Sequence, residues 1–298
     1  MKKIKLFYNP VSGDKKFPQQ LDTFIYKFQN AGYEVAIYRS EFNGDITKAV
    51  KKIVPDEYSI LAVAGGDGTI NEMVNGMVEA GIDIPLAIFP VGTANDFANH
   101  LNLPKSVADC CDVVLRNNIK EIDIGRVNNK YFINVCSGGL FTSVSQSVDL
   151  NVKNTLGKLA YYIKGIEQLP NFRPFKLRIE TSGDTIEDFF YLFLVLNGNG
   201  AGGFERLSRD ASVQDGLFDF VGVKAKPFHE LAILFLKILK GEHLDDPNIL
   251  FIRDKKFKIT CLEEDRRFYK SDVDGEKGPD LPLNIVVVEK KLKVFTNL

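Results

Sequence analysis

Three short stretches combine glycine with hydroxyl, amide and carboxylate side chains, and each follows an apolar run. They are YNPVSG at 8–13, GGDGT at 65–69 and FPVGTAND at 89–96. Glycine permits tight turns and lets a bulky ligand approach the backbone. Backbone N–H groups at the start of a helix attract phosphate. The three stretches therefore predict a phosphate-binding site.

Asp67, inside the second stretch, indicates what would accompany the phosphate. A carboxylate repels phosphate unless a cation stands between them, and a bridging Mg²⁺ resolves that conflict. The alternative is a plain helix N-cap turn, in which Gly, Asp and Thr are common. Three such turns in one chain favour the phosphate site over that alternative.

The chain up to Ile119 alternates between strand and helix periodicity. Apolar runs predict strands at 4–8, 33–39, 59–64 and 85–90, and helical spacing predicts helices at 17–32, 45–54 and 69–81. Such alternation is typical of a parallel sheet covered by helices. Open sheets of this kind bind ligands at the carboxyl ends of their strands, and the three stretches follow strands.

From Ile119 onward the pattern is mostly that of strands, beginning with two strands around an Asn128-Asn129 turn. Helices are predicted only at 155–169 and 227–241. The predicted fold class is an α/β N-terminal domain with a parallel sheet plus a β-rich, sandwich-like C-terminal domain. The predicted boundaries are 1–124, with the segment 290–298 returning to it, and 125–289.

Composition argues against several classes of protein. The 298 residues carry a net charge of -1, so no global basic field indicates nucleic acid as a partner. No signal peptide and no apolar run of about 18 residues is evident, so no transmembrane segment is predicted. The histidines lack a G-x-S-x-G elbow, which disfavours a serine hydrolase. The four cysteines lack zinc-site spacing and predict the reduced, buried thiols of a cytoplasmic protein: Cys110, Cys111, Cys136 and Cys261.

Gly198, Gly200 and Gly203 have the spacing G-x-G-x-x-G of a dinucleotide-binding fingerprint. That fingerprint requires a helix directly after the glycines, within a βαβ unit. The residues that follow, FERLSRDASVQDG, do not read as a helix. The dinucleotide interpretation is therefore rejected.

An acidic cluster lies near the C-terminus in KSDVDGEKGPD, at 270–280. Asp272, Asp274 and Glu276 alternate there, and in an extended chain they would project to one face. The alternative is a solvated acidic hairpin, which is the commoner fate of such residues. The positions of the glycine and the distal glutamate exclude an EF-hand.

The stretches NPVSG, GGDGT and PVGTANDFA, in this order, resemble the catalytic domain of the diacylglycerol kinase and sphingosine kinase superfamily. The similarity is greatest to its soluble bacterial lipid kinases and extends over nearly the whole chain. It implies an N-terminal domain like those of NAD kinases and phosphofructokinases. It also implies an ATP- and Mg²⁺-dependent lipid kinase, above all one that converts diacylglycerol to phosphatidic acid.

The resemblance implies roles for individual residues. Glu276 would be the general base that takes the proton of the acceptor hydroxyl, with Asp274 in the same Asp-Gly-Glu motif. Asp123 would assist it from the domain junction, and the site would lie between the domains. The implied nucleotide-binding residues are Asn9, Pro10, Ser12, Gly13, Ser40, Gly65, Gly66, Asp67, Gly68, Thr69, Asn71, Glu72 and Thr93.

Two metal positions are also implied by the resemblance. Asp215, with the carbonyl groups of Ser212 and Leu217, would hold a structural Mg²⁺, while Asp67 would meet the metal of Mg-ATP. A plain Asp-Gly turn is the alternative at Asp215. The chain departs from the family pattern just before this point, where Phe204 and the segment 209–211 replace a glycine and a proline.

Alternatives to a lipid kinase are a kinase for a soluble substrate, such as an NAD kinase, and a nucleotide- or lipid-binding protein without catalysis. The expected partner is a lipid substrate at a membrane surface, with the protein peripheral at the inner membrane face. A homodimer is an open alternative, and so is the acceptor lipid. The apolar helix at 228–240 could rest on a membrane or on its own sheet.

Overall fold

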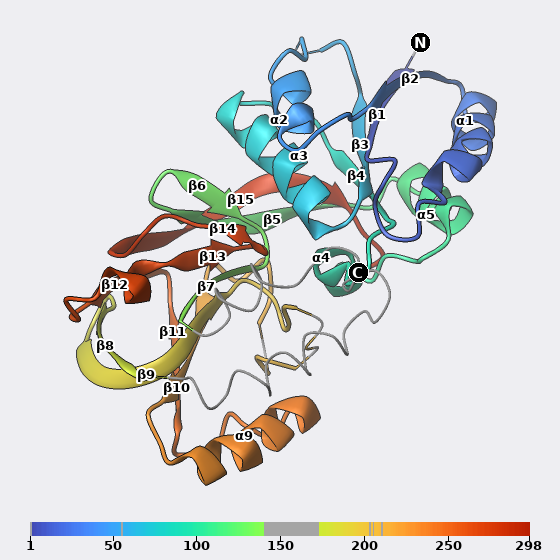
Figure 1. Cartoon of the computed structure of the whole chain (residues 1–298). Helices are drawn as coiled ribbons and strands as arrows, with labels where there is room; N and C mark the ends of the chain where they lie inside the picture. The colour runs from blue at the N-terminus through green and yellow to red at the C-terminus, as the bar shows by residue number, and fades with distance from the viewer. Residues whose placement is uncertain (1, 55, 140–172, 203, 205, 210) are drawn as a thin grey trace. The chain divides into compact units, whose positions relative to one another are not determined.

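The computed structural model describes residues 2–298 apart from 55, 140–172, 203, 205 and 210. The chain divides into two compact units: unit 1 comprises 1–122 with 290–298, and unit 2 comprises 123–289 (Figure 1). Strands β5 (Ile119–Val127) and β15 (Leu283–Phe295) each run from one unit into the other. The helix predicted at 155–169 lies outside the described residues.

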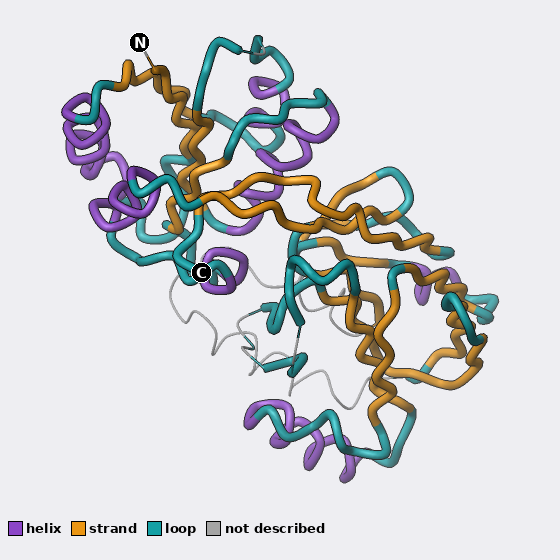
Figure 2. Tube along the Cα trace, turned by 180° about the vertical axis from the view of Figure 1, so that it is seen from behind, coloured by secondary structure: helices purple, strands orange, loops and turns teal. Residues whose placement is uncertain are grey.

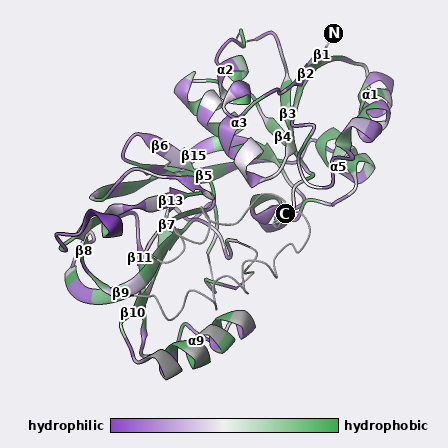
Figure 3. Cartoon of the chain, in the orientation of Figure 1, coloured by the Kyte–Doolittle hydropathy of each residue, from purple (hydrophilic) through white to green (hydrophobic). Residues whose placement is uncertain are grey.

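Unit 1 is built on a parallel sheet in the order β2-β1-β3-β4-β15. Its other strands are β1 (Lys2–Tyr8), β2 (Tyr33–Arg39), β3 (Ile60–Gly65) and β4 (Leu86–Pro90). β3 and β4 are buried along their whole length, and Figure 3 shows both as hydrophobic. Strands covered on both faces require such continuous apolar runs. The predicted α/β fold with a parallel sheet is confirmed.

Helices cover both faces of this sheet, with α1 (Leu21–Asn30) and α5 (Val107–Leu115) on one face and α2 (Asp45–Val50) and α3 (Asp67–Glu79) on the other (Figure 2). The predicted helix at 17–32 begins as a 3₁₀ turn, η1 (Phe17–Gln20), with a proline in its first turn, where a missing N–H is tolerated. α3 begins at Asp67 rather than at the predicted residue 69, so the GGDGT stretch itself starts the helix.

Unit 2 is β-rich, as predicted, and its main strand pairs are antiparallel. Its main path is β14-β13-β7-β9-β8-β12-β15, while β10 pairs with β9 and β11, and β5 pairs with β6 around the predicted Asn128-Asn129 turn. The strands not yet defined are β6 (Lys130–Phe132), β7 (Val135–Gly139), β8 (Phe175–Glu180), β9 (Thr185–Leu196), β10 (Phe218–Lys224), β11 (Ile249–Asp254), β12 (Lys256–Cys261), β13 (Ser271–Val273) and β14 (Glu276–Lys277). In the described residues after β9 the next strand or helix is β10, which agrees with rejecting the dinucleotide motif.

The helix α9 (Phe228–Lys240) packs against the sheet of unit 2. Leu231 and Leu234 lie in a buried cluster with side chains of β9 and β10, while Ile233 and Leu236 are exposed. Docking on its own sheet therefore accounts for the buried face of this helix. Among the described residues, no helix combines the length and the apolar character needed to cross a membrane.

Candidate functional site

The turns after β1, β3 and β4 meet at one edge of the unit 1 sheet, because these strands are parallel neighbours. Backbone hydrogen bonds tie the turns together where the strands end. The N–H of Asn9 donates to the carbonyl of Ala64 (3.0 Å), and the N–H of Val91 donates to that of Gly65 (3.1 Å). The three stretches singled out in the sequence therefore lie together, and we call this place the glycine edge.

Glycine is required where these turns touch. A Cβ at Gly13 would lie 2.1 Å from the carbonyl oxygen of Val91, and its φ of +55° is also unfavourable for other residues. A Cβ at Gly92 would lie 2.3 Å from the Cα of Gly66. The backbones of the three turns are thus in direct contact at the glycine edge. A ligand bound at this contact would therefore meet backbone groups rather than side chains.

Several predicted nucleotide residues lie at this edge. The side-chain amide of Asn9 donates to the hydroxyl of Thr69 (3.3 Å), which joins the first turn to α3. The N–H of Ser40 donates to the carbonyl of Tyr8 (2.9 Å), so the end of β2 adds a fourth turn. The predicted residues in the four turns or in the first turn of α3 are Asn9, Pro10, Ser12, Gly13, Ser40, Gly65, Gly66, Asp67, Gly68, Thr69 and Thr93.

Asn71 and Glu72 lie farther along α3 and make contacts within the helical layer. Asn71 is 8% exposed, and its side-chain oxygen accepts from the amide of Asn75 (2.7 Å). The carbonyl of Glu72 accepts from the hydroxyl of Thr47 in α2 (2.9 Å). These contacts stabilise α3 and its packing on α2, so a nucleotide role for the two residues stays a prediction.

Asp67 links two of the turns. Its Oδ1 accepts a hydrogen bond from the N–H of Phe97 (3.2 Å), at the start of the short helix α4 (Asp96–His100). Burial raises the pKa of the Asp67 carboxyl, and hydrogen bonds from the backbone of Phe97, Asp96 and Asn95 oppose that rise. The sequence predicted that Asp67 faces phosphate, but it did not predict the hydrogen bond with Phe97. The only sign of that bond in the sequence is the start of a second helix, α4, thirty residues later.

Asp67→Asn is expected to raise the thermal unfolding midpoint of the ligand-free protein at neutral pH by a few degrees. Because the pKa of Asp67 is raised in the folded protein, the folded state binds this proton more tightly than the unfolded chain does. The contribution of Asp67 to stability is therefore full at low pH and is lost as pH rises through its folded pKa. The gain from Asn should therefore shrink on acidification. Calorimetric scans across pH measure this.

The matched control is Asp14→Asn, at an exposed carboxyl whose pKa is lowered by its hydrogen bonds with Lys16. That change should not raise the midpoint at any pH. An Asp67→Asn protein that is less stable than the native chain at neutral pH would show that the bond to Phe97 outweighs the cost of burying the charge.

Asp123 is fixed inside unit 2, where it is 1% exposed. Its Oδ2 accepts from the N–H of Gly216 (2.8 Å), and its own N–H donates to the carbonyl of Val213 (2.6 Å). The amide of Asn197 donates to the carbonyls of Asp123 and Ile133, each at 2.9 Å. The sequence indicated Asp123 but not Asn197, which fixes it from the end of β9.

Asp274 forms a turn between β13 and β14. Its Oδ2 accepts from the N–H of Ile133 (2.7 Å), and its Oδ1 accepts from those of Asn134 and Val135 (2.9 Å each). Asp274 has a φ of +51° and is followed by Gly275 at +85°. The carboxylate thus holds the turn against the segment 133–135.

The prediction that the three acidic residues project to one face is wrong, because the chain reverses between them. The alternative, a solvated acidic hairpin, is correct in that the segment is a hairpin, but two of its three carboxylates are buried. Asp272 and Asp274 are 4% and 8% exposed, and Asp272 accepts from the N–H of Gly275 (2.8 Å). Glu276 is exposed at the start of β14. Backbone N–H groups satisfy the buried carboxylates, which sequence alone could not reveal.

Asp215, the predicted structural metal ligand, is paired with a cation of the protein. Its Oδ2 lies 2.7 Å from Nη2 of Arg253, and its Oδ1 accepts from the N–H of Leu217 (3.0 Å). Nε of Arg253 also lies 2.9 Å from Oδ1 of Asp219, a nearly buried carboxyl. A metal ion at Oδ2 would compete with the guanidinium of Arg253, and the structural Mg²⁺ at Asp215 stays a prediction.

Arg253→Gln is expected to destabilise the protein by on the order of 2–3 kcal/mol, because it leaves the buried Asp219 carboxylate without its cation. Millimolar Mg²⁺ should recover part of that loss in the variant and leave the native chain unchanged relative to EDTA. Arg209→Gln, which removes the partner of the exposed Asp245, is the control. A midpoint that rises with Mg²⁺ in the native protein and not in Asp215→Asn would instead support the predicted metal.

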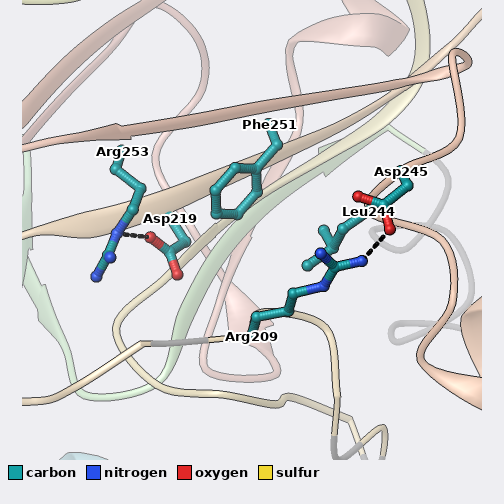
Figure 4. Close-up of a pocket in the computed structure, with 6 residues that line it drawn as sticks. All are labelled: Arg209, Asp219, Leu244, Asp245, Phe251 and Arg253. Atoms are coloured by element: carbon teal, nitrogen blue, oxygen red, sulfur yellow. Dashed lines mark hydrogen bonds and ion pairs between the residues drawn. The ribbon is translucent and has the colours of Figure 1, made fainter.

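A pocket of about 220 Å³ lies beside this ion pair in unit 2. Figure 4 shows the Arg253–Asp219 and Arg209–Asp245 pairs with Phe251 between them. The volume is below the ~300–1,000 Å³ typical of small-molecule sites. Leu244 completes the lining, and none of the predicted site residues contributes to it. The pocket is therefore not the candidate site.

Two family models match the chain in succession. Residues 3–127 match the diacylglycerol kinase catalytic domain, and residues 134–296 match the YegS C-terminal NAD kinase beta sandwich-like domain. The second match agrees with the predicted sandwich-like C-terminal domain. Together the two models cover the glycine edge of unit 1 and the turn that carries Glu276.

Similar proteins extend over the full chain. A diacylglycerol kinase of Bacillus subtilis is 38% identical over 99% of this chain and 96% of the relative. One from Staphylococcus aureus is 36% identical over 99% and 92%. The crystal structure of a diacylglycerol kinase from Bacillus anthracis has a TM-score of 0.82 at 26% identity and covers 99% of this chain and 97% of that one. The chain therefore belongs to the diacylglycerol kinase catalytic domain family and is a kinase with an alcohol group as acceptor.

Proposed function

We propose that this kinase transfers the γ-phosphate of ATP to the hydroxyl of a membrane lipid, with diacylglycerol as acceptor and phosphatidic acid as product. The glycine edge carries the proposal, because backbone from three strand ends meets there at Gly13, Gly66 and Gly92. Phosphoryl transfer needs positioning and charge neutralisation more than covalent chemistry. The relatives named diacylglycerol kinase support the acceptor, which implies work at a membrane surface.

The donor would lie with its phosphates against the first turn of α3. The residues there suit Mg-ATP. The contacts at the glycine edge leave no room for a Cβ, so backbone N–H groups would face the phosphates. Asp67 offers a carboxylate oxygen, which is the kind of ligand that Mg²⁺ prefers. When bound, Mg²⁺ supplies charge neutralisation and phosphate alignment. Asn9 and Thr69, joined by a hydrogen bond, would fix the first turn beside the donor.

Unit 2 would supply the proton acceptor. We assign the general base to Glu276, an exposed carboxylate on a turn that Asp274 holds from within. Asp123 would assist it as a fixed, buried carboxylate, because its position is set by Gly216 and Asn197. A positioned base of this kind accelerates proton transfer from an alcohol by about 10²–10⁴-fold.

The test follows radiolabel from γ-labelled ATP. Purified protein is incubated with Mg²⁺ and detergent micelles that contain diacylglycerol, a monoacylglycerol or a sphingoid base, with NAD in a parallel reaction. Label in phosphatidic acid establishes the proposed activity, and label in another lipid phosphate changes only the acceptor. Label in NADP would establish the NAD kinase alternative. ATP binding without transfer to any acceptor would point to a binding protein.

A further inference from the structure

Asn95 holds the turn after β4 with a single side chain. Its Oδ1 accepts from the N–H of Gly92 (2.8 Å), and its Nδ2 donates to the carbonyl of the same residue (2.9 Å). The backbone of Asn95 is left-handed, with φ 54° and ψ 41°, a conformation that Asn tolerates better than most residues. The amide therefore fixes both polar backbone groups of Gly92 at once.

Gly92 is the residue whose orientation matters at the glycine edge. A Cβ on Gly92 would lie 2.3 Å from the Cα of Gly66 and 3.2 Å from its nitrogen. Gly66 is the N-cap of α3, so the backbone N–H groups of the first helical turn follow it directly. A rotation of the Gly92 peptide would push on Gly66 and shift those groups.

The chain beyond Asn95 is tied to the same place. The N–H of Phe97, two residues on, donates to Asp67 at the start of α3 (3.2 Å). Asn95 thus lies between two contacts with one helix start, Gly92 against Gly66 and Phe97 with Asp67. Loss of its side chain would free the segment between those contacts while leaving the strands of the sheet in place.

We propose that Asn95 is a positioning residue for the triphosphate of the donor nucleotide, an inference that rests on the proposed function. Its side chain sets the separation between the turn after β4 and the first turn of α3, whose backbone N–H groups would contact neighbouring phosphates. A displacement of ~1 Å at such a place can cost about 10²-fold in rate, because the γ-phosphate is no longer aligned with the acceptor.

The test compares Asn95→Gly with Asn102→Gly. Glycine keeps the left-handed backbone at residue 95 and removes only the two side-chain hydrogen bonds. Asn102 has φ 53°, is exposed and belongs to the same unit, so its replacement repeats the chemical change away from the glycine edge. Asn95→Asp keeps the acceptor for the Gly92 N–H, but it turns an oxygen toward the Gly92 carbonyl and adds a negative charge beside the proposed phosphates, which makes it a second disruptive variant.

The expected result is a fall in kcat of roughly 10–100-fold in Asn95→Gly and a fall at least as large in Asn95→Asp. Calorimetric titration without acceptor should show a smaller preference for ATP over ADP in Asn95→Gly. Asn102→Gly should keep both quantities. Thermal scans establish that each variant is folded at the assay temperature, and Asn95→Asp is used if Asn95→Gly is not.

A kcat of Asn95→Gly within about twofold of that of Asn102→Gly, or a change in KM alone, would overturn the proposal, because the residue would then contribute only uniform binding. If the native protein binds ATP but phosphorylates nothing, the proposed function fails, and the ATP preference of Asn95→Gly still decides the role of Asn95. A native protein that binds neither nucleotide overturns both proposals.

Discussion

Replacing Glu276 with glutamine is expected to lower kcat for transfer to the lipid by about 10²–10⁴-fold. Glutamine keeps the length and polarity of the side chain but cannot take up the proton of the acceptor hydroxyl. Glu276 is exposed on a two-residue strand, so the thermal midpoint and the Kd for ATP should not change. Label transfer at saturating ATP and acceptor gives kcat, and calorimetry gives the Kd.

Glu264→Gln provides the matched control, since Glu264 is an exposed glutamate of the same unit outside the hairpin. Its kcat should equal that of the native enzyme. If Glu276→Gln also retains full kcat, the base is another group, and the buried Asp123 becomes the carboxylate to test. A loss of kcat accompanied by an equal loss in the control would indicate a charge effect on lipid binding rather than proton transfer.

The parallel sheet and the glycine edge could be predicted because both depend on residue types that are close together in the sequence. Strands buried on both faces need continuous apolar runs, as in residues 60–65 and 86–90. Glycines that touch one another's backbone tolerate no side chain, so they stand out where strands end. The strand order then brings the three turns together without further information, because parallel neighbours end at one edge.

The partners of the carboxylates could not be predicted, because those pairs join residues far apart in the chain. Arg253 in β11 pairs with Asp215 in the turn before β10, and Asp67 accepts from the N–H of Phe97 thirty residues later. The sequence of a short polar segment with an aspartate does not reveal whether the carboxylate is buried by tertiary packing or exposed to water. For Asp215 the sequence allowed a metal or a turn and gave no sign of the ion pair with Arg253 that the structure shows.

The same limit explains the acidic cluster near the C-terminus. Alternation of Asp272, Asp274 and Glu276 fits a strand, yet Gly275 permits the positive φ that reverses the chain. Which of the carboxylates is buried depends on the segment 133–135, whose N–H groups have no signature in the sequence. Motif resemblance groups Asp274 with Glu276, while the structure separates them into a buried residue that holds the turn and an exposed residue at its end.

Asp274→Ala is expected to destabilise the protein by on the order of 3–5 kcal/mol, which would lower the unfolding midpoint by about 10 °C. Alanine removes the acceptor for three backbone N–H groups, two of them in buried bonds with Asp274, and leaves those donors unsatisfied. It also places a β-carbon at a φ of +51°, which adds strain. Thermal and denaturant unfolding measure the loss.

Two further variants separate the turn from the chemistry. Asp274→Asn tolerates the left-handed backbone and keeps one acceptor oxygen, so it should recover part of the stability. Asp184→Ala removes an exposed aspartate of the same unit and should cost little. If Asp274 acts by holding the turn, kcat in Asp274→Asn should fall less than in Glu276→Gln. Between the two Asp274 variants, the less stable one should also have the lower kcat. A fully stable Asp274→Asn enzyme with the kcat of Glu276→Gln would instead place Asp274 in the proton transfer itself.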